Sequence, residues 1–357
     1  MPDILNNLSK IKSLDSQNML GSIEHLHKQV EQIVSESASL TFPDSYKNIT
    51  SVVILGMGGS TLGAHVLKSL YAHELRVPVE IINGYRIPRY VSEKTLAIVS
   101  SYSGTTEEPV AAMKEAEERG AKIVVISSGG TLAEEAKKKN LPALIFSTIN
   151  NPCGSPRMGL GYSLAGQMMI FHKAGLLSFS KDDIKTLIQV LEKYEALYGA
   201  GQATMDNAPR RIALSLDPYS LWYVGAEHLV GSAHVAANQM NENAKRFAGF
   251  FTIPELNHHL MEGMMFPTSD TATIAFLFFE SKLYDQRVQK RFEITKKVLH
   301  KDHVTCFSYM CQEETLLGQV AEVLVFSSYL SFYTAIAEGI DPTAIPVVDF
   351  FKEQLKK

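Results

Sequence analysis

The chain has 357 residues, of which 45% are hydrophobic and 20% charged, and its 34 basic and 38 acidic side chains give a formal net charge of -4. This length and composition exclude disulfide-dependent mini-proteins, coiled coils and disordered chains, and they favour two domains that share a large core. Nucleic acid is not an expected partner, because no basic run is present that would neutralise a series of phosphates.

The cysteine content indicates a reducing compartment. Cys153, Cys306 and Cys311 are too few and odd in number for a disulfide framework, so we expect a cytoplasmic protein. The N-terminal segment lacks the uninterrupted apolar run of a signal peptide. The longest apolar stretch starts at Val320 but contains Glu322 and several hydroxyl side chains. It therefore predicts a buried helix rather than a membrane span.

The first half of the chain alternates between strand and helix patterns. Apolar residues at helical spacing predict one helix over residues 18–39. Five short β-branched runs follow, and most are separated by helical patterns; they start at residues 51, 77, 95, 122 and 141. Such an alternation predicts a parallel sheet with right-handed crossovers.

The second half repeats this rhythm. Helices are predicted at 158–175 and 181–200, and a segment rich in Gly, Ala and Asn follows at 199–211. Strand and helix patterns then alternate again from residue 220. We therefore expect a helical segment at 1–38, a first α/β domain at 39–200 and a second at 201–357.

The first strand runs directly into a glycine turn and a helix. Gly56, Gly58 and Gly59 precede Ser60, and the helical pattern begins near Leu62. Glycines let the backbone approach an anion closely, and a helix start offers free N–H groups and the positive end of the helix dipole. The spacing matches neither the dinucleotide fingerprint nor the P-loop. Taken alone, the motif fits a turn without a ligand equally well.

The third strand ends in a cluster of hydroxyl side chains. Five occur within seven residues: Ser100, Ser101, Ser103, Thr105 and Thr106. A capping box formed by Thr105 and Glu108 would explain one of them without any ligand. Both loops would lie at the carboxyl ends of parallel strands, where ligands bind in open α/β sheets. Together the two motifs predict a phosphate site.

Further motifs along the chain resemble a known family. The segments are GMGGS at 56–60, SYSGTT at 101–106, NPCGSPRMGLGY at 151–162, NENAK at 241–245, PELNHH at 254–259 and DPTAIPVVDFFKEQLK at 341–356. The first two resemble SIS (sugar isomerase) domains in general, and the other four resemble the bifunctional phosphoglucose/phosphomannose isomerases in particular. The resemblance implies two SIS-type three-layer αβα sandwich domains with mainly parallel sheets, preceded by an N-terminal helix.

The resemblance also implies an activity: interconversion of glucose 6-phosphate and mannose 6-phosphate with fructose 6-phosphate through ring opening and a cis-enediol, without a metal or other cofactor. The implied phosphate-binding residues are Gly59, Ser60, Ser101, Ser103 and Thr106. Arg157 matches the arginine near the reacting C1–C2 region, and Glu242 matches the base that shuttles the proton. His258 matches a histidine contributed across a homodimer with shared active sites, and Lys352 matches a lysine near the C-terminus.

Chemistry alone also favours these residue types. Isomerisation beside a carbonyl needs a carboxylate base, a cation for the enediolate and an acid/base pair that opens the ring. Glu242, Arg157, and His258 with Lys352 supply one of each. Thr343 is a candidate substrate contact, because a small hydroxyl residue leaves room for protonation of either face at C2.

Each assignment has an ordinary structural alternative. Glu242 is placed to form a surface ion pair with Lys245 or Arg246, three or four residues further along a helix. Without the motif match, Arg157 on its Gly/Pro-rich loop is better explained as the partner of a carboxylate, and Lys352 as a solvated lysine. Two residues also depart from the family pattern: Thr105 replaces a usual Asn or Asp, and His259 replaces a usual Asn.

A metal site near His258 is a further alternative. Glu255, His258, His259 and Glu262 lie at helical spacing and are residue types that bind zinc. Pro254 immediately before them weakens this interpretation, and a histidine paired with a nearby carboxylate is the simpler one. No metal is therefore expected.

Two other functions stay open at this point: a sugar-phosphate-binding regulator without catalytic activity, and an isomerase of another sugar phosphate. A regulator normally carries an additional effector domain, and no basic helix-turn-helix pattern precedes the first sheet. The sequence thus favours an enzyme. For the dimer, we expect the apolar helices at 158–175 and 320–337 to offer packing surface, and we expect neither nucleic acid nor membrane as a partner.

Overall fold

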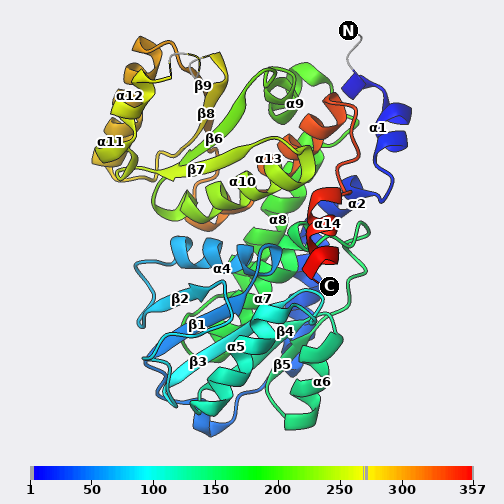
Figure 1. Cartoon of the computed structure of the whole chain (residues 1–357), viewed down its shortest axis with the longest axis vertical. Helices are drawn as coiled ribbons and strands as arrows, with labels where there is room; N and C mark the ends of the chain where they lie inside the picture. The colour runs from blue at the N-terminus through cyan, green and yellow to red at the C-terminus, as the bar shows by residue number, and fades with distance from the viewer. Residues whose placement is uncertain (1–3, 268, 270–271, 356–357) are drawn as a thin grey trace.

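The computed structural model describes residues 4–267, 269 and 272–355 and shows an α/β protein with two parallel sheets, one above the other in Figure 1. The expected segments 1–38 and 201–357 each include a few residues outside the described ranges, and the motif at 341–356 includes one, residue 356. The first half contains α1 (Leu8–Leu14), α2 (Met19–Ile23), α3 (Leu26–Glu36), β1 (Ser51–Gly56), α4 (Gly59–Leu70), β2 (Val79–Ile82), β3 (Thr95–Ser101), α5 (Glu107–Glu118), β4 (Lys122–Ser127), α6 (Gly130–Lys139), β5 (Ala143–Ile145), α7 (Leu160–Lys173) and α8 (Lys181–Tyr198). The second half contains α9 (Ala208–Ala213), β6 (Ser220–Gly225), α10 (Val230–Ala244), β7 (Ala248–Thr252), α11 (Leu256–His259), β8 (Ile274–Glu280), α12 (Gln286–Lys301), β9 (Thr305–Met310), α13 (Leu316–Ala337) and α14 (Pro346–Leu355).

The first sheet has the strand order β2-β1-β3-β4-β5, with every pair parallel, so the five predicted strands are confirmed. Successive side chains of a strand face opposite sides of a sheet. Val53 and Val99 join a buried cluster with residues of α5 and α6, whereas Val52 and Ile54 join the larger core with α4 and α7. Helices thus cover both faces, as a three-layer αβα sandwich requires.

The second sheet repeats this arrangement with one strand fewer. Its order, β7-β6-β8-β9, matches that of the first four strands of the first sheet, and its pairs are also parallel. On one face Phe278 packs against Phe292 of α12, with ring centroids 5.9 Å apart. On the other face Phe279 packs against Phe326 of α13 at 6.1 Å. The expected duplicated architecture is confirmed.

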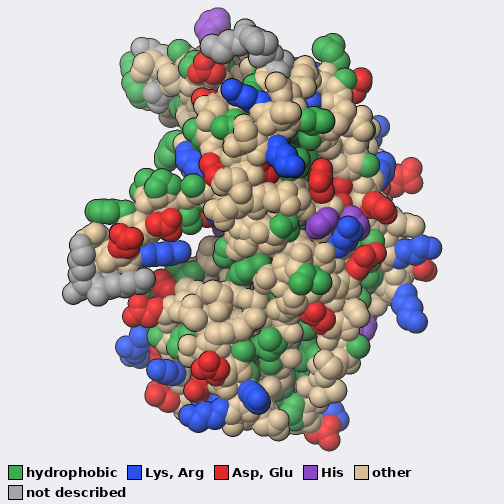
Figure 2. All heavy atoms as spheres, turned by 90° about the vertical axis from the view of Figure 1, so that its right-hand side faces the viewer, with side chains coloured by type: hydrophobic (Ala, Val, Ile, Leu, Met, Phe, Trp, Pro, Cys, Tyr) green, Lys and Arg blue, Asp and Glu red, His purple; other side chains and the backbone are tan. Residues whose placement is uncertain are grey.

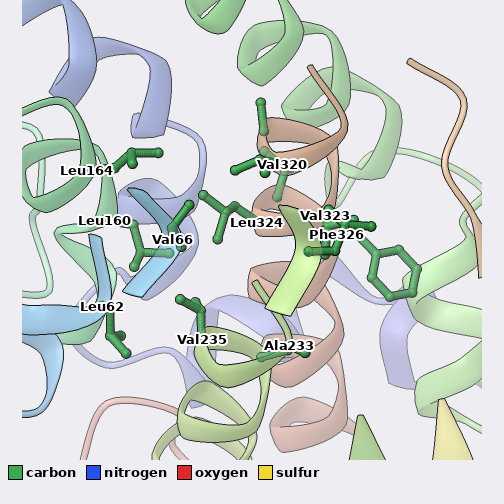
Figure 3. Packing of buried hydrophobic residues seen from close by; sticks show 14 of the residues in the cluster. Leu62, Val66, Leu160, Leu164, Ala233, Val235, Val320, Val323, Leu324 and Phe326 are labelled. Atoms are coloured by element: carbon green, nitrogen blue, oxygen red, sulfur yellow. The ribbon is translucent and has the colours of Figure 1, made fainter. Parts of the chain in front are cut away.

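Helices from both halves pack together between the two sheets. Figure 3 shows apolar side chains from four helices meeting there: Leu62 and Val66 of α4, Leu160 and Leu164 of α7, Ala233 and Val235 of α10, and Val320, Val323, Leu324 and Phe326 of α13. Gly231 allows the close approach of α10 to α4, because a Cβ there would lie 2.4 Å from the carbonyl oxygen of His65. The two halves therefore share one core.

The apolar stretch that starts at Val320 lies in a buried helix, α13, as predicted. Within the described residues α13 is the one helix long and apolar enough to cross a membrane, but 94% of its most apolar window is buried inside the protein. Glu322 is compatible with this burial because its carboxylate accepts hydrogen bonds from the Tyr309 hydroxyl (2.8 Å) and from the backbone N–H groups of Gln312 and Glu313. Burial raises the pKa of Glu322.

Two expectations were wrong. Residues 18–39 do not form one helix: His25 leaves the helical conformation (φ -111°, ψ 13°), so α2 and α3 are separate and the apolar side of α3 packs on α7. The helices at 158–175 and 320–337 do not offer dimer surface. Residues 160–171 of α7 and 317–336 of α13 are buried within the chain itself. Their apolar composition serves the shared core.

Candidate active site

The first candidate phosphate loop joins β1 to α4. Gly58 adopts a backbone conformation that favours glycine (φ 49°), and α4 begins at the next residue without a side-chain cap. The Ser60 hydroxyl oxygen accepts a hydrogen bond from the backbone N–H of Tyr102 (2.8 Å), and the Ser60 carbonyl accepts one from the Ser100 hydroxyl (2.7 Å). These bonds hold the loop against the end of β3.

The second candidate phosphate loop joins β3 to α5 and gathers the predicted hydroxyl groups. The hydroxyl oxygens of Ser101 and Thr106 lie 2.9 Å apart, and those of Ser103 and Thr105 lie 3.1 Å apart. The capping box predicted as an alternative does not form: Thr106, not Thr105, is the N-cap, and its side chain makes no cap hydrogen bond. The first N–H groups of α5 are therefore not satisfied by the N-cap side chain, which suits an anion.

The two loops are neighbours because β1 pairs with β3 along the whole length of β1, from Ser51–Thr95 to Gly56–Ser100. Strand β2 lies on the other side of β1, so the chain leaves β1 and β3 in opposite directions along the sheet. Ligands of open α/β sheets bind at such a reversal, outside the carboxyl ends of the strands.

Arg157 is the most enclosed charged group near these loops. It lies in a short 3-10 helix (Pro156–Met158) and is only 2% exposed. Its Nη1 donates to Glu242 Oε2 at 3.3 Å, and its Nε donates to the side-chain oxygen of Asn243. Burial lowers the pKa of Arg157 and the Glu242 carboxylate opposes that shift. A guanidinium remains charged at neutral pH even so, and the site therefore holds a buried cation beside a carboxylate.

Arg157 and the first phosphate loop are in direct contact. A Cβ placed on Gly59 would lie 2.7 Å from the backbone nitrogen of Arg157 and 2.7 Å from the carbonyl carbon of Pro156. Only a residue without a side chain permits this approach. The first candidate phosphate loop therefore packs directly against the backbone of the segment whose Arg157 side chain pairs with Glu242.

The alternative pairings of Glu242 are not what the structure shows. Arg246 pairs instead with Glu338, and Lys245 directs its ammonium to the carbonyl oxygens of Asn243 (3.0 Å) and Asp341 (2.6 Å). The carboxylate partner of Arg157 is Glu242 itself. The ordinary alternative for Arg157 was pairing with a carboxylate, and the functional assignment placed Arg157 and Glu242 in one site. The ion pair between these two residues fits both.

Thr343 lies beside the guanidinium. Its carbonyl oxygen accepts from Arg157 Nη2 at 2.9 Å, and its backbone N–H donates to the Asp341 carboxylate at 2.8 Å. The residue is 6% exposed, and its hydroxyl has no hydrogen-bond partner within the described residues. Sequence reasoning put Thr343 at the site, and the structure brings it next to Arg157.

His258 and Lys352 are not brought together within one chain. His258 is exposed on α11 and Lys352 is exposed on α14. Figure 1 shows these two helices on opposite sides of the molecule. Among the residues that the structure describes, no three His, Cys, Asp or Glu side chains gather to hold a metal ion, so Glu255, His258, His259 and Glu262 do not form the alternative zinc site.

Three polar residues of the site were not predicted. Asn243 is fully buried, accepts from Arg157 and donates to the Ser331 hydroxyl at 3.0 Å. Asp341 and Lys245 hold the segment that contacts Arg157. Asn243 and Lys245 belong to the NENAK motif, so the signal was present, but the sequence does not say which of its polar residues faces inward.

A cavity of about 590 Å³ lies away from this site, between α4 and α10. Its lining includes His65 and His234, whose rings meet edge to face with their centroids 4.2 Å apart, and none of the candidate catalytic residues.

The face seen in Figure 2 carries acidic and basic side chains scattered among one another, without a continuous basic patch.

Comparisons with known proteins show the family to which the chain belongs. The model of the family described as "Bacterial phospho-glucose isomerase C-terminal SIS domain" matches residues 205–355, and that of the family described as "SIS domain" matches residues 45–144. The bifunctional phosphoglucose/phosphomannose isomerase of Caldicellulosiruptor bescii is 30% identical over 347 residues, which are 94% of this chain and 98% of the relative. The chain belongs to this family. The enzyme of the same name from Aquifex aeolicus is 29% identical and covers 94% of this chain and 99% of its own.

Solved structures share the fold at lower identity. A hypothetical protein from Thermus thermophilus has a TM-score of 0.75 at 16% identity and covers 98% of this chain and 93% of its own. A glucosamine-6-phosphate deaminase from Thermotoga maritima has a TM-score of 0.65 at 16% identity, with 96% and 97% covered. The isomerase family and the SIS fold of this chain are thus established from its sequence and from its architecture.

Proposed function

We propose that this protein interconverts glucose 6-phosphate and mannose 6-phosphate with fructose 6-phosphate. The observation that carries the proposal is the direct contact of the first candidate phosphate loop with the backbone of Arg157, whose buried side chain pairs with Glu242. A sugar 6-phosphate has its anion at one end and its reacting carbons, C1 and C2, at the other. In the proposed site the two loops bind the anion, and Arg157 with Glu242 acts on the reacting carbons.

The phosphate is held by hydroxyl and backbone donors. Gly59 and Ser60 supply the start of α4, and Ser101, Ser103 and Thr106 supply the loop before α5. A phosphate at these helix starts would be favoured by the free N–H groups and by the dipoles of both helices. Discrimination between sugars then falls to the residues around Arg157, since every sugar phosphate presents the same anion.

Glu242 acts as the base. It removes the proton from C2 of the open-chain aldose, and the electrons of that C–H bond form the C1–C2 double bond of a cis-enediol while O1 gains a proton. Glu242 then returns the proton to C1 as O2 loses its own proton and becomes the ketose carbonyl. Arg157, held by Glu242 and Asn243, stabilises the negative charge that develops on the oxygens.

Ring opening needs an acid and a base at the ring oxygen and at O1, and His258 and Lys352 are assigned to this step. Their positions on α11 and α14 suit a homodimer in which His258 completes the site of the partner subunit. The exposed apolar residues of α14, which include Val347, Phe350 and Phe351, offer surface for such a neighbour.

Both aldoses give the same enediol, because glucose and mannose 6-phosphates differ only at C2. One base serves both epimers if the C1–C2 bond rotates in the pocket, and the small Thr343 beside Arg157 leaves room for that rotation. The chemistry needs no metal, because Arg157 supplies the positive charge. We further assign the first α/β domain to residues 39–200, the second to 201–357, and the enzyme to the cytoplasm.

The test is a coupled assay of the purified protein with each 6-phosphate, with and without EDTA. Turnover of both aldoses in chelator supports the proposal. Activity on one aldose alone would defeat the bifunctional assignment, and turnover only of other sugar phosphates would favour a different isomerase. Tight binding of sugar phosphates without turnover would favour a regulator.

A further inference from the structure

Lys245 ends α10 in a conformation that is unusual for its residue type. It is the C-cap residue and is left-handed, with φ 52° and ψ 27°. Helices that end this way usually place glycine or asparagine there, because the left-handed conformation costs a residue with a Cβ about 1 kcal/mol or more. A lysine at this position indicates that contacts of its side chain offset this cost.

That side chain is turned back toward the protein. Although much of the residue is exposed, its ammonium donates to the carbonyl oxygen of Asn243 (3.0 Å) and to that of Asp341 (2.6 Å). The first bond satisfies a carbonyl of the last turn of α10, which has no partner within the helix. The second bond joins α10 to a segment nearly 100 residues further along the chain. Lys245 therefore links the helix that carries Glu242 to the turn at 341–343.

This turn is held by two cations of the same site. Lys245 donates a hydrogen bond to the carbonyl oxygen of Asp341, and Arg157 donates to those of Pro342 (3.1 Å) and Thr343 (2.9 Å). Three consecutive carbonyl oxygens thus each accept from a charged side chain. Hydrogen bonds from charged donors are the stronger kind. The Asp341 carboxylate closes the turn from inside by accepting from the backbone N–H of Thr343.

The turn positions α14. This helix begins at Pro346, three residues after Thr343, and none of its residues is buried within the chain. Its orientation is therefore not fixed by a packed apolar face of its own subunit. Among the described contacts, those made by Lys245 and Arg157 at the turn are the ones that connect the start of this segment to the candidate catalytic residues.

We propose that Lys245 is a positioning residue of the isomerase site: by binding the carbonyls of Asn243 and Asp341, it holds the 341–343 turn, and with it Thr343 and the start of α14, in register with Glu242. Arg157 carries charge to the substrate and also binds the turn, whereas the described hydrogen bonds of the Lys245 ammonium go to Asn243 of its own helix and to Asp341 of the turn. The expected effect on kcat rests on the proposed function. The expected effect on the order of the 341–343 turn rests on the contacts alone.

The test compares Lys245→Met, Lys245→Arg and a matched control, Lys297→Met, which removes an exposed lysine of α12 that pairs with Glu293. The first readout is hydrogen–deuterium exchange of peptides that cover 341–355. The second is kcat and KM with fructose 6-phosphate. Lys245→Met should exchange faster in 341–355 and lose about tenfold to hundredfold in kcat, since misplacement by about 1 Å costs that much. KM should change little because the phosphate loops are untouched.

Lys245→Arg keeps the charge and the donors, so it should recover most of both readouts, and Lys297→Met should match the wild type. Wild-type exchange at 341–355 in Lys245→Met would overturn the proposal. Faster exchange spread over the whole chain, with no recovery in Lys245→Arg, would also overturn it, because that result marks a general loss of stability. If the wild-type protein has no isomerase activity, the proposed function fails while the exchange comparison still decides whether Lys245 holds the turn.

Discussion

The contact between Gly59 and Arg157 gives a prediction that separates catalysis from folding. Gly59→Ala adds one methyl group at the first residue of α4, where the backbone has an ordinary helical conformation and alanine is otherwise favoured. The new Cβ would lie 2.7 Å from the backbone nitrogen of Arg157, whereas ordinary contacts begin at 3.4 Å. The 156–158 segment must then move by about 0.7 Å or more away from the phosphate loop.

Overpacking of this kind costs typically 1–3 kcal/mol, and the replacement of glycine by alanine in a helix returns roughly 0.5–1 kcal/mol. The net loss of folding stability should therefore stay below about 2.5 kcal/mol. A displacement of nearly 1 Å between the phosphate and the reacting carbons should lower kcat by about 10²-fold. Urea unfolding measures the first quantity, and steady-state kinetics measures the second.

The control is Gly84→Ala, because no atom lies within 4 Å of a Cβ at Gly84. It should leave both kcat and stability near the wild-type values. A Gly59→Ala variant with wild-type kcat would refute the idea that the spacing between the first phosphate loop and Arg157 matters for the reaction.

The site and its surroundings give three more predictions. Ser103→Ala should raise KM by about tenfold or more, with kcat nearly kept, because each lost hydrogen bond to a charged oxygen costs about 1.5–3 kcal/mol; wild-type affinity in a titration would remove Ser103 from the phosphate site. Glu242→Gln and His258→Asn subunits, each nearly inactive, should regain activity when refolded together, and demonstrated heterodimers without recovery would show that each site is built within one chain. Burial, with help from His234 and Lys68, lowers the pKa of His65 from 6.5 to about 4, so the unfolded chain takes up the proton first and stability should decline as pH falls from about 6.5 to 4. His65→Phe should flatten that decline in urea unfolding at a series of pH values, and an unchanged pH dependence would contradict the assignment.

The strands, and the two loops that follow β1 and β3, were predictable because their signals are local. A β-branched run followed by glycines or hydroxyls fixes a strand end, and strand pairing then brings the loops after β1 and β3 together. The contact between Arg157 and Glu242 is different, since 85 residues separate them and only the packing of the shared core places them side by side. The family resemblance named both residues, but it did not show that they touch.

Apolar composition was the least informative signal. The helices at 158–175 and 320–337 read as apolar on every side, which shows that something buries them but not whether that is the same chain or a partner. In the structure they are the centre of the core between the two sheets. The break between α2 and α3 was hidden for a similar reason, because the spacing of apolar residues continues through His25 while the backbone does not.

The most direct test of the account is the conversion of fructose 6-phosphate in heavy water and EDTA, followed by NMR, for the wild-type protein and for Glu242→Gln. The wild type should form both glucose and mannose 6-phosphates, with deuterium at C2 in part of each product. Glu242→Gln should form both at a rate lower by about 10²- to 10⁴-fold, with substrate binding kept. Rapid formation of both aldoses by Glu242→Gln, or no conversion by the wild type, would contradict the assignment of Glu242 as the base of this isomerase.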